Sequence, residues 1–332
     1  MFVNIYLYSF MKNFVYCFDE NYNIQGYCSI MSLLKNCEKK INIYVVHQNP
    51  QTFVEFAKII KSNKFLDNLK LYKFENKNYN FPNLKNKHVS EATYYRLFLD
   101  QYLPTDIDSF IYLDADAFFI NKFTDLINTE IEKLKSSNFT IAALNSKTHF
   151  NYKRLGLKNR RYFNAGVLLV DYKKWLEKKV SLSFMEILKT RKNDLMFWDQ
   201  DILNIYFDGN FYNLDESLNF NVYGDQKSSK EVLSNIINNA VIIHYSGKYK
   251  PWSPKGVLAK ESKFFNTIYK ELFNKNYLIV NIFSTNTLKI LLSNIFSFRI
   301  LKLDHPISYI YLSLLSVINK EKLRNYKIEK NR

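Results

Sequence analysis

Residues 110–116 read FIYLDAD, an apolar run that ends abruptly in two aspartates separated by one alanine. A short apolar run bounded by polar sequence predicts a buried strand. Residues i and i+2 of an extended segment point to the same side, so we expect Asp114 and Asp116 to face one crevice at the strand end. Two close carboxylates repel each other unless a cation joins them, and hard divalent cations prefer oxygen ligands. The segment therefore predicts a metal site at a sheet edge.

The sequence on either side alternates between strand and helix patterns. Helical spacing is found at 24–34 and 53–60. This alternation is typical of a parallel sheet in an α/β domain, whose ligands bind at the carboxyl ends of the strands. Further apolar runs with strand character occupy residues 14–18, 41–46, 69–74, 140–144, 167–170 and 240–243.

The 332-residue chain is strongly basic, with 47 Lys and Arg against 31 Asp and Glu and a net charge of +16. A basic protein prefers anionic partners such as phosphorylated substrates, acidic lipid or nucleic acid. The basic residues are scattered without a dense block, so a nucleic-acid-binding motif is not predicted. Cys17, Cys28 and Cys37 form no C-x-x-C, and we expect buried thiols without a disulfide or zinc site.

A change of composition near residue 275 divides the chain into a main domain, 12–275, and a basic C-terminal segment, 276–332. Apolar residues at helical spacing between Leu288 and Leu301 predict an amphipathic helix in this segment. Such a helix either lies on an anionic membrane surface or packs on the main domain. No apolar run reaches the roughly 18 residues of a membrane span. We expect Met11 to be the natural start, which would make residues 1–10 a dispensable extension.

The segment HYSGKYKPW at 244–252 follows the apolar run AVII and offers both a metal ligand and an anion site. His244 is a candidate third metal ligand, and one imidazole beside carboxylates shifts the preference from Mg²⁺ toward Mn²⁺. Gly247 permits close approach of the backbone to a phosphate, and Lys250 supplies a positive charge. A surface loop with a hydrogen-bonded histidine is the alternative interpretation.

Three other motifs carry polar groups suited to a sugar, and each has a structural alternative. FNAG at 163–166 offers an amide and small residues, or forms a tight turn before a strand. DQD at 199–201 suits sugar hydroxyls, or begins a helix where Asp is favoured by capping. Arg96 bridges an anion and a sugar, or is a helix residue held in a salt bridge. G-x-G-x-x-G, Walker A and G-x-S-x-G motifs are absent from the sequence, which disfavours dinucleotide, P-loop and α/β-hydrolase chemistry.

Taken together, the order of six segments resembles glycosyltransferase family 8, whose members are retaining, metal-dependent GT-A enzymes that use UDP-sugars. The chain is most similar to bacterial lipopolysaccharide galactosyltransferases and glucosyltransferases, over about residues 12–260. The resemblance implies an α/β, Rossmann-like GT-A fold for 12–275, with a mixed sheet flanked by helices, and a helical basic C-terminal extension. The segments are FDENY (18–22), TYYRL (93–97), YLDAD (112–116), FNAGV (163–167), DQDILN (199–204) and HYSGKYKPW (244–252).

The resemblance also implies roles for single residues. Asp114, Asp116 and His244 would bind Mn²⁺, with Mg²⁺ as the alternative. Gln200 matches the family residue beneath the anomeric carbon, and Asp199 and Lys250 complete the catalytic set. Asn145-Ser146 stands where many relatives carry an acidic residue for the sugar hydroxyls, which leaves the donor sugar open. The implied UDP-sugar-binding residues are Asp19, Asn21, Tyr22, Thr93, Arg96, Ala115, Asn145, Asn164, Ala165, Gly247 and Lys250.

The partners implied are a UDP-hexose carrying galactose or glucose, a saccharide or lipid-linked glycan acceptor, and no nucleic acid. An anionic membrane surface is a further partner suggested by the basic tail, so we expect a cytoplasmic protein or one attached to the cytoplasmic face of the inner membrane. A non-catalytic sugar-nucleotide or glycan-binding protein is the alternative function. A D-x-D phosphotransferase is disfavoured because Ala117 and Phe118 follow the second aspartate, where Thr or Gly is expected.

Overall fold

The computed structural model describes residues 11–77, 79–82, 90–146, 150–223, 230–253, 256–275, 285–303 and 306–318. The expected N-terminal extension, 1–10, lies outside the described residues, as do 276–284 and 319–332 of the basic segment. The chain divides into two compact units, Met1–Asn219 and Phe220–Arg332. The boundary that we predict near residue 275 falls inside the second unit and stays a prediction.

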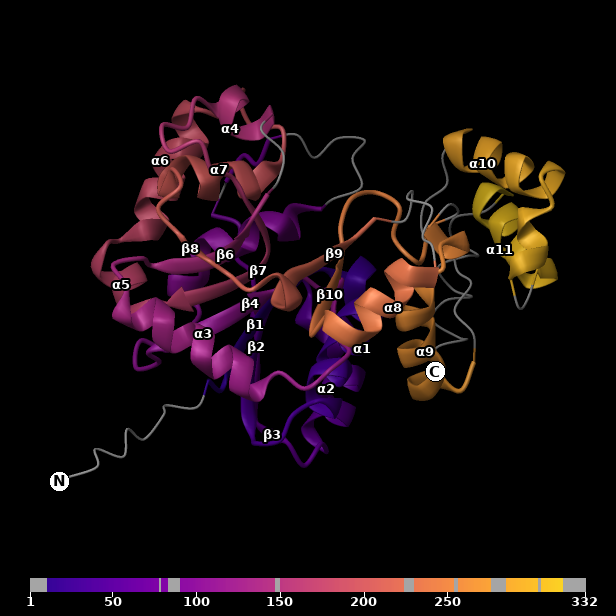
Figure 1. Cartoon of the computed structure of the whole chain (residues 1–332), viewed down its shortest axis with the longest axis horizontal. Coiled ribbons are helices and arrows are strands. Elements are labelled where there is room, and N and C mark those ends of the chain that lie inside the picture. Colours follow the sequence, from indigo (N-terminus) through magenta and orange to yellow (C-terminus); the bar gives the residue numbers. More distant parts are fainter. Residues whose placement is uncertain are drawn as a thin grey trace. The chain divides into compact units, whose positions relative to one another are not determined.

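A seven-stranded sheet forms the centre of the first unit (Figure 1). In spatial order its strands are β3 (Leu66–Lys73), β2 (Ile41–His47), β1 (Asn13–Phe18), β4 (Ser109–Leu113), β7 (Phe163–Asp171), β6 (Ile141–Asn145) and β8 (Tyr212–Asn213). Strands β1 to β4 are mutually parallel, as the strand–helix alternation predicts. Strand β7 runs antiparallel to both β4 and β6, which confirms the mixed sheet that the family resemblance implies.

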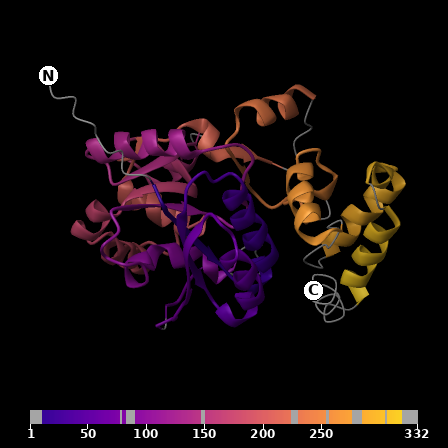
Figure 2. The ribbon, with the colours of Figure 1, turned by 90° about the horizontal axis from the view of Figure 1, so that it is seen from below.

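Alternate residues of β1 face the two sides of the sheet, and each side is covered by helices (Figure 2). On one side Tyr16 accepts a hydrogen bond from Ser29 of α1 (Asn23–Lys35), and Phe18 packs edge-on against Phe53, just before α2 (Val54–Lys61). On the other side a buried hydrophobic cluster joins the sheet to η3 (Glu91–Gln101), α6 (Val180–Thr190) and α7 (Trp198–Phe207).

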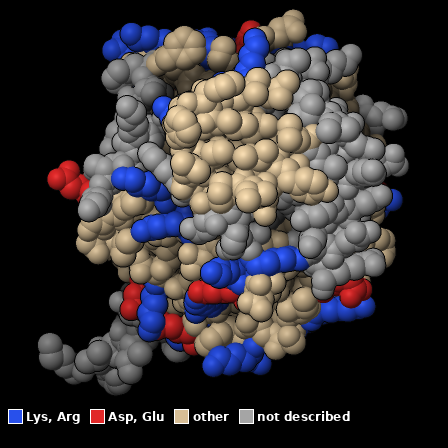
Figure 3. Space-filling model, turned by 90° about the vertical axis from the view of Figure 1, so that its right-hand side faces the viewer, with Lys and Arg blue, Asp and Glu red and all other residues tan. Residues whose placement is uncertain are grey.

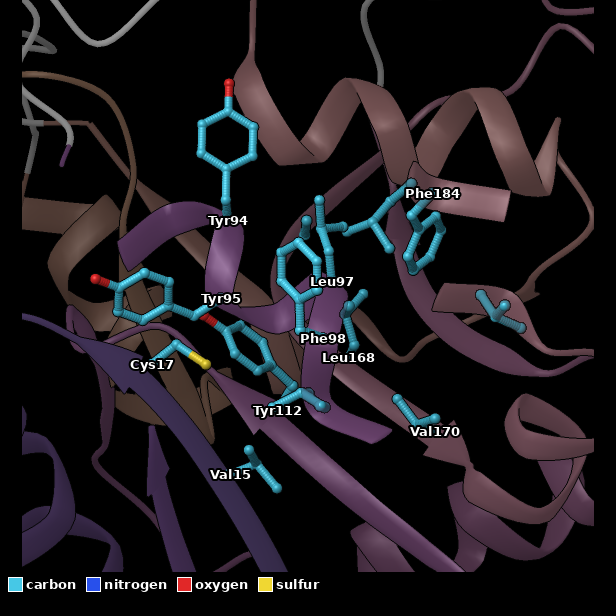
Figure 4. Packing of buried hydrophobic residues seen from close by; sticks show 14 of the residues in the cluster. Val15, Cys17, Tyr94, Tyr95, Leu97, Phe98, Tyr112, Leu168, Val170 and Phe184 are labelled. Atoms are coloured by element: carbon cyan, nitrogen blue, oxygen red, sulfur yellow. The ribbon is translucent and has the colours of Figure 1, made fainter. Parts of the chain in front are cut away.

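The 3-10 helix η3 is fixed on the sheet by its aromatic residues (Figure 4). Tyr94, Tyr95 and Phe98 are fully buried, and the Tyr95 ring stacks on Phe74 with centroids 3.8 Å apart. The burial of side chains on either side of Arg96 forces this cation into the interior too, where only 5% of it is exposed. Aromatic packing thus places a positive charge beneath the sheet's functional edge.

The other elements of the first unit are η1 (Glu20–Tyr22), η2 (Pro50–Phe53), β5 (Ala117–Phe119), α3 (Thr124–Ser136), α4 (Phe150–Leu155), α5 (Tyr172–Glu177) and η4 (Glu216–Asn219). Cys17, Cys28 and Cys37 are buried free thiols, as expected. Burial raises the pKa of Cys37 to about 12, which keeps this thiol protonated.

In the second unit, β9 (Phe220–Val222) pairs in parallel with β10 (Ile242–Tyr245). The other elements are helical: α8 (Lys230–Asn239), η5 (Gly256–Leu258), α9 (Ser262–Phe273), α10 (Thr285–Phe296), η6 (Arg299–Lys302) and α11 (Pro306–Ile318). Helices α10 and α11 lie side by side and share a small core with η5, formed by Val257, Leu291, Ile300 and Tyr309. The helical character expected of the C-terminal segment is confirmed for its described residues.

Candidate active site

Asp114 and Asp116 lie in the turn between β4 and β5, where their carboxylates offer oxygens within 4.8 Å of each other. The Ala117 N–H donates to the Asp114 carbonyl oxygen at 3.0 Å, so the triplet is a tight turn and not the extended segment that we expected. The turn nevertheless brings both side chains together, and the Asp114 N–H anchors it by donating to the Gly166 carbonyl oxygen at 2.8 Å. Ala115, at the centre of the turn, is buried. Two neighbouring carboxylates fit a hard divalent cation.

The buried guanidinium of Arg96 joins two of the predicted site aspartates. It contacts Asp114 Oδ1 through Nη2 at 2.6 Å and Asp199 Oδ2 through Nε at 2.8 Å. It also donates to the Ala165 carbonyl oxygen and lies over the Tyr112 ring, 4.2 Å from the centroid. The Tyr112 hydroxyl in turn donates to Asp114 Oδ1 at 2.8 Å. The salt-bridge alternative for Arg96 is therefore confirmed.

Asp199 is buried, and burial raises the pKa of its carboxyl group. Removal from water raises the pKa of this carboxyl to about 6, while Arg96 and a 2.5 Å hydrogen bond from the Thr93 hydroxyl oppose the shift. Burial alone would lower the pKa of Arg96, but Asp114 and Asp199 together raise it above the ordinary value. Arg96 is consequently a permanent cation, whereas Asp199 changes charge in the weakly acidic range.

Gln200 lies in the first turn of α7, and both ends of its side-chain amide are held. The Oε1 atom accepts from the Ala165 N–H at 3.0 Å, and Nε2 donates to the Tyr162 hydroxyl at 2.9 Å. The Asn204 side chain, one helical turn further along, bonds both backbone groups of Phe163 at 2.8 and 3.0 Å. Helix α7 is thereby attached to β7 beside the carboxylate turn.

Asp201 lies in the first turn of α7, at the helix start that the alternative interpretation of DQD predicts. Its Oδ2 accepts from the backbone N–H groups of Met196 and Phe197 at 2.7 and 2.8 Å, directly before α7. Its Oδ1 accepts from Tyr162 and Arg154, both at 2.7 Å. Asp201 is wholly buried, so the four bonds replace the water that its charge would otherwise attract.

The segment FNAG lies inside strand β7, so the tight-turn interpretation is wrong. Asn164 Oδ1 accepts from the Gly166 N–H at 3.0 Å and from the Asn219 amide at 3.1 Å. Ala165 serves two predicted site residues through its backbone, because its carbonyl oxygen bonds Arg96 and its N–H bonds Gln200. A small side chain at this position leaves room for both partners.

The predicted nucleotide-binding residues follow the carboxyl end of β1. Asp19 is buried and caps η1, its Oδ1 accepting from the Asn21 N–H at 3.0 Å. Tyr22 ends η1 and adjoins α1. The neighbouring strand end carries His47, which no sequence motif predicts. Its Nδ1 accepts from the Asn49 N–H at 2.9 Å, and burial lowers its pKa to about 4. His47 is therefore a neutral, structural histidine.

Asn145 is the last residue of β6, where the sequence departs from the family pattern. Its Oδ1 is buried and has no hydrogen-bond partner among the described residues. Its N–H donates to Asn213 Oδ1 at 3.3 Å. A neutral amide therefore occupies the position at which we expected many relatives to carry a charge.

The second unit contains the other predicted ligands. His244 lies within β10 and does not follow it; its Nδ1 is 3.4 Å from Ser246 Oγ. Gly247 has φ +77°, a conformation that favours glycine, and the Lys250 ammonium donates to the Tyr245 carbonyl oxygen. At Gly256 a Cβ atom would lie 2.0 Å from the Lys250 carbonyl oxygen, so this glycine is required for the loop to close.

Comparison with known proteins identifies the class to which this arrangement belongs. The model of Glycosyl transferase family 8 matches residues 13–256, and the chain belongs to that family. A putative glycosyltransferase of Haemophilus influenzae is 30% identical over 73% of each chain. A lipopolysaccharide 1,2-glucosyltransferase of Escherichia coli is 28% identical over 76% of each chain, and a lipopolysaccharide 1,3-galactosyltransferase of Salmonella typhimurium is 27% identical over 74%.

Solved structures show the same fold. The galactosyltransferase LgtC, crystallised with donor and acceptor sugar analogues, superposes with a TM-score of 0.64, covering 84% of this chain and 99% of LgtC at 20% identity. A second LgtC structure, of an active-site mutant, gives a TM-score of 0.63 at 22% identity over 78% of this chain and 95% of LgtC. The expected GT-A glycosyltransferase fold is confirmed.

Proposed function

We propose that this family 8 enzyme is a retaining transferase that moves galactose or glucose from a UDP-sugar to a saccharide of lipopolysaccharide, lipooligosaccharide or another surface glycan. The observation that carries the proposal is the Asp114–Asp116 carboxylate pair, linked through buried Arg96 and Ala165 to Gln200. The relatives from Escherichia coli and Salmonella typhimurium, which act on lipopolysaccharide, support the acceptor class.

We propose Asp114, Asp116 and His244 as the ligands of a divalent cation, Mn²⁺ or Mg²⁺. The carboxylate pair supplies hard oxygen donors, and an imidazole in the set favours Mn²⁺. When bound, the cation supplies Lewis-acid stabilisation of the departing diphosphate. Gly247 and Lys250 are proposed to contact the phosphates.

We assign the other donor contacts by motif. Asp19, Asn21 and Tyr22 are proposed to hold the nucleoside, at the carboxyl end of β1 where such folds bind ligands. Burial and mutual hydrogen bonding orient the sugar-binding groups before the donor arrives, which lowers the entropic cost of binding. The sugar contacts are proposed to be Thr93, Arg96, Ala115, Asn145, Asn164, Ala165, Asp199 and Gln200.

Retention of configuration is proposed to occur by attack on the face from which UDP leaves. An amide such as Gln200 is a weak nucleophile, and both ends of its side chain are engaged. Asp201 is fully buried, and its four hydrogen bonds occupy both oxygens. With neither group set for covalent attack, the acceptor hydroxyl bonds the anomeric carbon directly and passes its proton to the leaving phosphate oxygen.

The proposal is tested by incubating the purified chain with a panel of UDP-sugars, Mn²⁺ and bacterial oligosaccharide acceptors. We expect UDP release that depends on an acceptor, with galactose or glucose donors preferred and an α-linked product visible by NMR. If UDP-sugars bound but no UDP were released with any donor of the panel, the result would favour the non-catalytic alternative and overturn the proposal.

We further propose that α10 and α11 attach the enzyme to an anionic membrane surface at the cytoplasmic face of the inner membrane. Residues 285–303 and 306–318 contain Lys289, Arg299 and Lys302 and neither Asp nor Glu. Figure 3 shows a broad area of uncharged side chains with Lys and Arg along part of its edge, on the side where α10 and α11 are drawn in Figure 1. The exposed large apolar residues are Leu292, Phe296, Phe298, Leu301, Ile307, Tyr311 and Leu314.

In this proposal α10 and α11 lie at the membrane surface and do not cross the bilayer. None of the helices in the described part of the chain has the length and apolar character needed to cross a bilayer. An amphipathic basic surface instead binds by inserting apolar side chains among anionic headgroups. Sedimentation with vesicles of anionic or neutral lipid tests it, and we expect binding to the anionic vesicles alone. Equal recovery in the supernatant with both lipids would contradict it.

A further inference from the structure

The orientation of the Gln200 amide is fixed from both ends by groups that cannot reverse their roles. The Ala165 backbone N–H is only a donor, so the atom 3.0 Å from it is the amide oxygen. At the other end Nε2 lies 2.9 Å from the Tyr162 hydroxyl. That hydroxyl must accept from Nε2 because it donates its own proton to Asp201 Oδ1, 2.7 Å away.

Asp201 fixes the direction of the hydrogen bonds that run from Gln200 through Tyr162. The charged carboxylate only accepts hydrogen bonds, so Tyr162 has no other direction in which to donate. Arg154 Nη2 bonds the same oxygen at 2.7 Å, and Arg154 Nη1 donates to the Asp194 carbonyl oxygen at 2.8 Å. Arg154 thereby pairs with the fully buried Asp201 and holds it in place.

We propose that Tyr162 is a positioning residue for Gln200, and that Asp201 and Arg154 act only by holding Tyr162. The inference rests on the proposed function, which places Gln200 at the donor sugar, and it takes Gln200 to stabilise the positive, oxocarbenium-like charge that develops on the sugar as UDP leaves. An amide presents the negative end of its dipole through oxygen and the positive end through NH₂. The hydrogen bonds that fix the positions of the amide oxygen and NH₂ therefore decide whether the amide stabilises or opposes a developing positive charge.

The Tyr162→Phe substitution tests the proposal. It removes the acceptor for Gln200 Nε2 and leaves one fixed contact, from Ala165, so the amide gains freedom to rotate. We expect kcat for transfer to fall about 10- to 100-fold, with the donor KM changed less than about twofold, since misplacing a reacting group affects the transition state most. Titration calorimetry with UDP and Mn²⁺ should give the wild-type stoichiometry, which shows that the variant is folded.

Tyr172→Phe is a matched control. Tyr172 is equally buried, but its hydroxyl has no hydrogen-bond partner among the described residues. Loss of this oxygen should leave kcat within about twofold of the wild-type value, because no polar contact is removed. An equal loss of kcat in both variants would mean that any buried tyrosine is sensitive, and would overturn the inference.

A double-mutant cycle with Gln200→Ala separates positioning from a structural role. If Tyr162 acts only through Gln200, Tyr162→Phe should reduce kcat no further when Gln200 is already alanine. Multiplicative losses in the double variant would overturn the inference, as would normal kcat in Tyr162→Phe alone. Absence of transfer by the wild-type enzyme across all donors would overturn the proposed function first, so the two failures are distinguishable.

Discussion

The first unit and the C-terminal helices α10 and α11 differ in which side chains they expose to water. The first unit buries charged residues, whereas the region of α10 and α11 exposes large apolar ones. In the first unit, Arg96 is 5% exposed and its guanidinium contacts two carboxylates. At the C-terminal end of α10 and just before η6, Phe296 is 79% and Phe298 is 73% exposed. Polar groups are thus enclosed with partners in one region, while large apolar groups stand in solvent in the other.

The difference separates a site built for chemistry from a surface built for contact. A buried charge costs several kcal/mol unless it is paired, so the Arg96 network persists only because each member satisfies another. A cluster of exposed aromatic and aliphatic side chains is favourable only when another surface covers it. The charges of the first region are therefore paired within the fold, whereas the second region has the character of the membrane-binding face that we propose.

The largest expected effect concerns the carboxylate turn. Asp116→Ala removes one of the two proposed oxygen ligands, and Mn²⁺-dependent transfer should fall by at least about 10³-fold, because electrostatic stabilisation by a bound cation is worth several kcal/mol. Asp67→Ala, which removes an aspartate paired with exposed Lys12, should leave turnover unchanged. Initial rates of UDP release measure both. Turnover of Asp116→Ala within a few-fold of wild type would end the metal assignment.

Much of this fold was readable from sequence because its strands are short apolar runs. Segments 14–18, 41–46 and 110–113 match β1, β2 and β4 closely, since fully buried strands need apolar residues on both faces. The direction of β7 was not readable. An apolar run has no direction, and only the path of the connection between β6 and β7 makes the pair antiparallel.

The site was readable in part, for a similar reason. The aspartates of the turn were predicted, although the turn itself was not, because D-x-D suits both extended and turn backbones. The pairing of Arg96 with Asp114 and Asp199 joins positions that are distant in sequence, which no local pattern reveals. Tyr162 was missed too, despite standing directly before FNAG.

The second expected effect measures how strongly the buried network depends on its cation. Arg96→Met leaves Asp114 and Asp199 without their shared partner, and the free energy of unfolding should fall by about 3–5 kcal/mol. Lys58→Met breaks an exposed pair with Glu55 at 2.8 Å and should cost less than about 1 kcal/mol. Urea denaturation at neutral pH compares them. Equal losses would show that the network contributes no more than a surface ion pair.

A third, smaller effect tests the other side of the comparison. Phe296→Ser combined with Phe298→Ser should weaken binding to anionic vesicles by about 10²-fold or more, since each buried Phe side chain contributes about 1.5–3 kcal/mol. The melting temperature should not fall, because both side chains are exposed in the free protein. Leu182→Ser, at a position 67% exposed on α6, should not alter vesicle binding. Unchanged binding of the double variant would remove the proposed membrane face.

The smallest effect is a pH dependence of stability that comes from Asp199. Its pKa is about 6 in the folded protein, above the ordinary value of 3.8, so the folded state holds this proton more tightly than the unfolded state. Protonation in this window therefore favours folding, and the contribution of Asp199 to stability rises as pH falls from 7 to 5. Over that interval the gain should be about 1 kcal/mol.

Asp199→Asn provides the control because the amide does not titrate, while the other ionisable groups remain. The difference in unfolding free energy between wild type and Asp199→Asn should shift by about 1 kcal/mol in favour of the wild type between pH 7 and pH 5. Parallel curves would mean that Arg96 holds the Asp199 carboxylate ionised throughout. The buried charge of the first unit would then be as insensitive to pH as the apolar surface of α10 and α11.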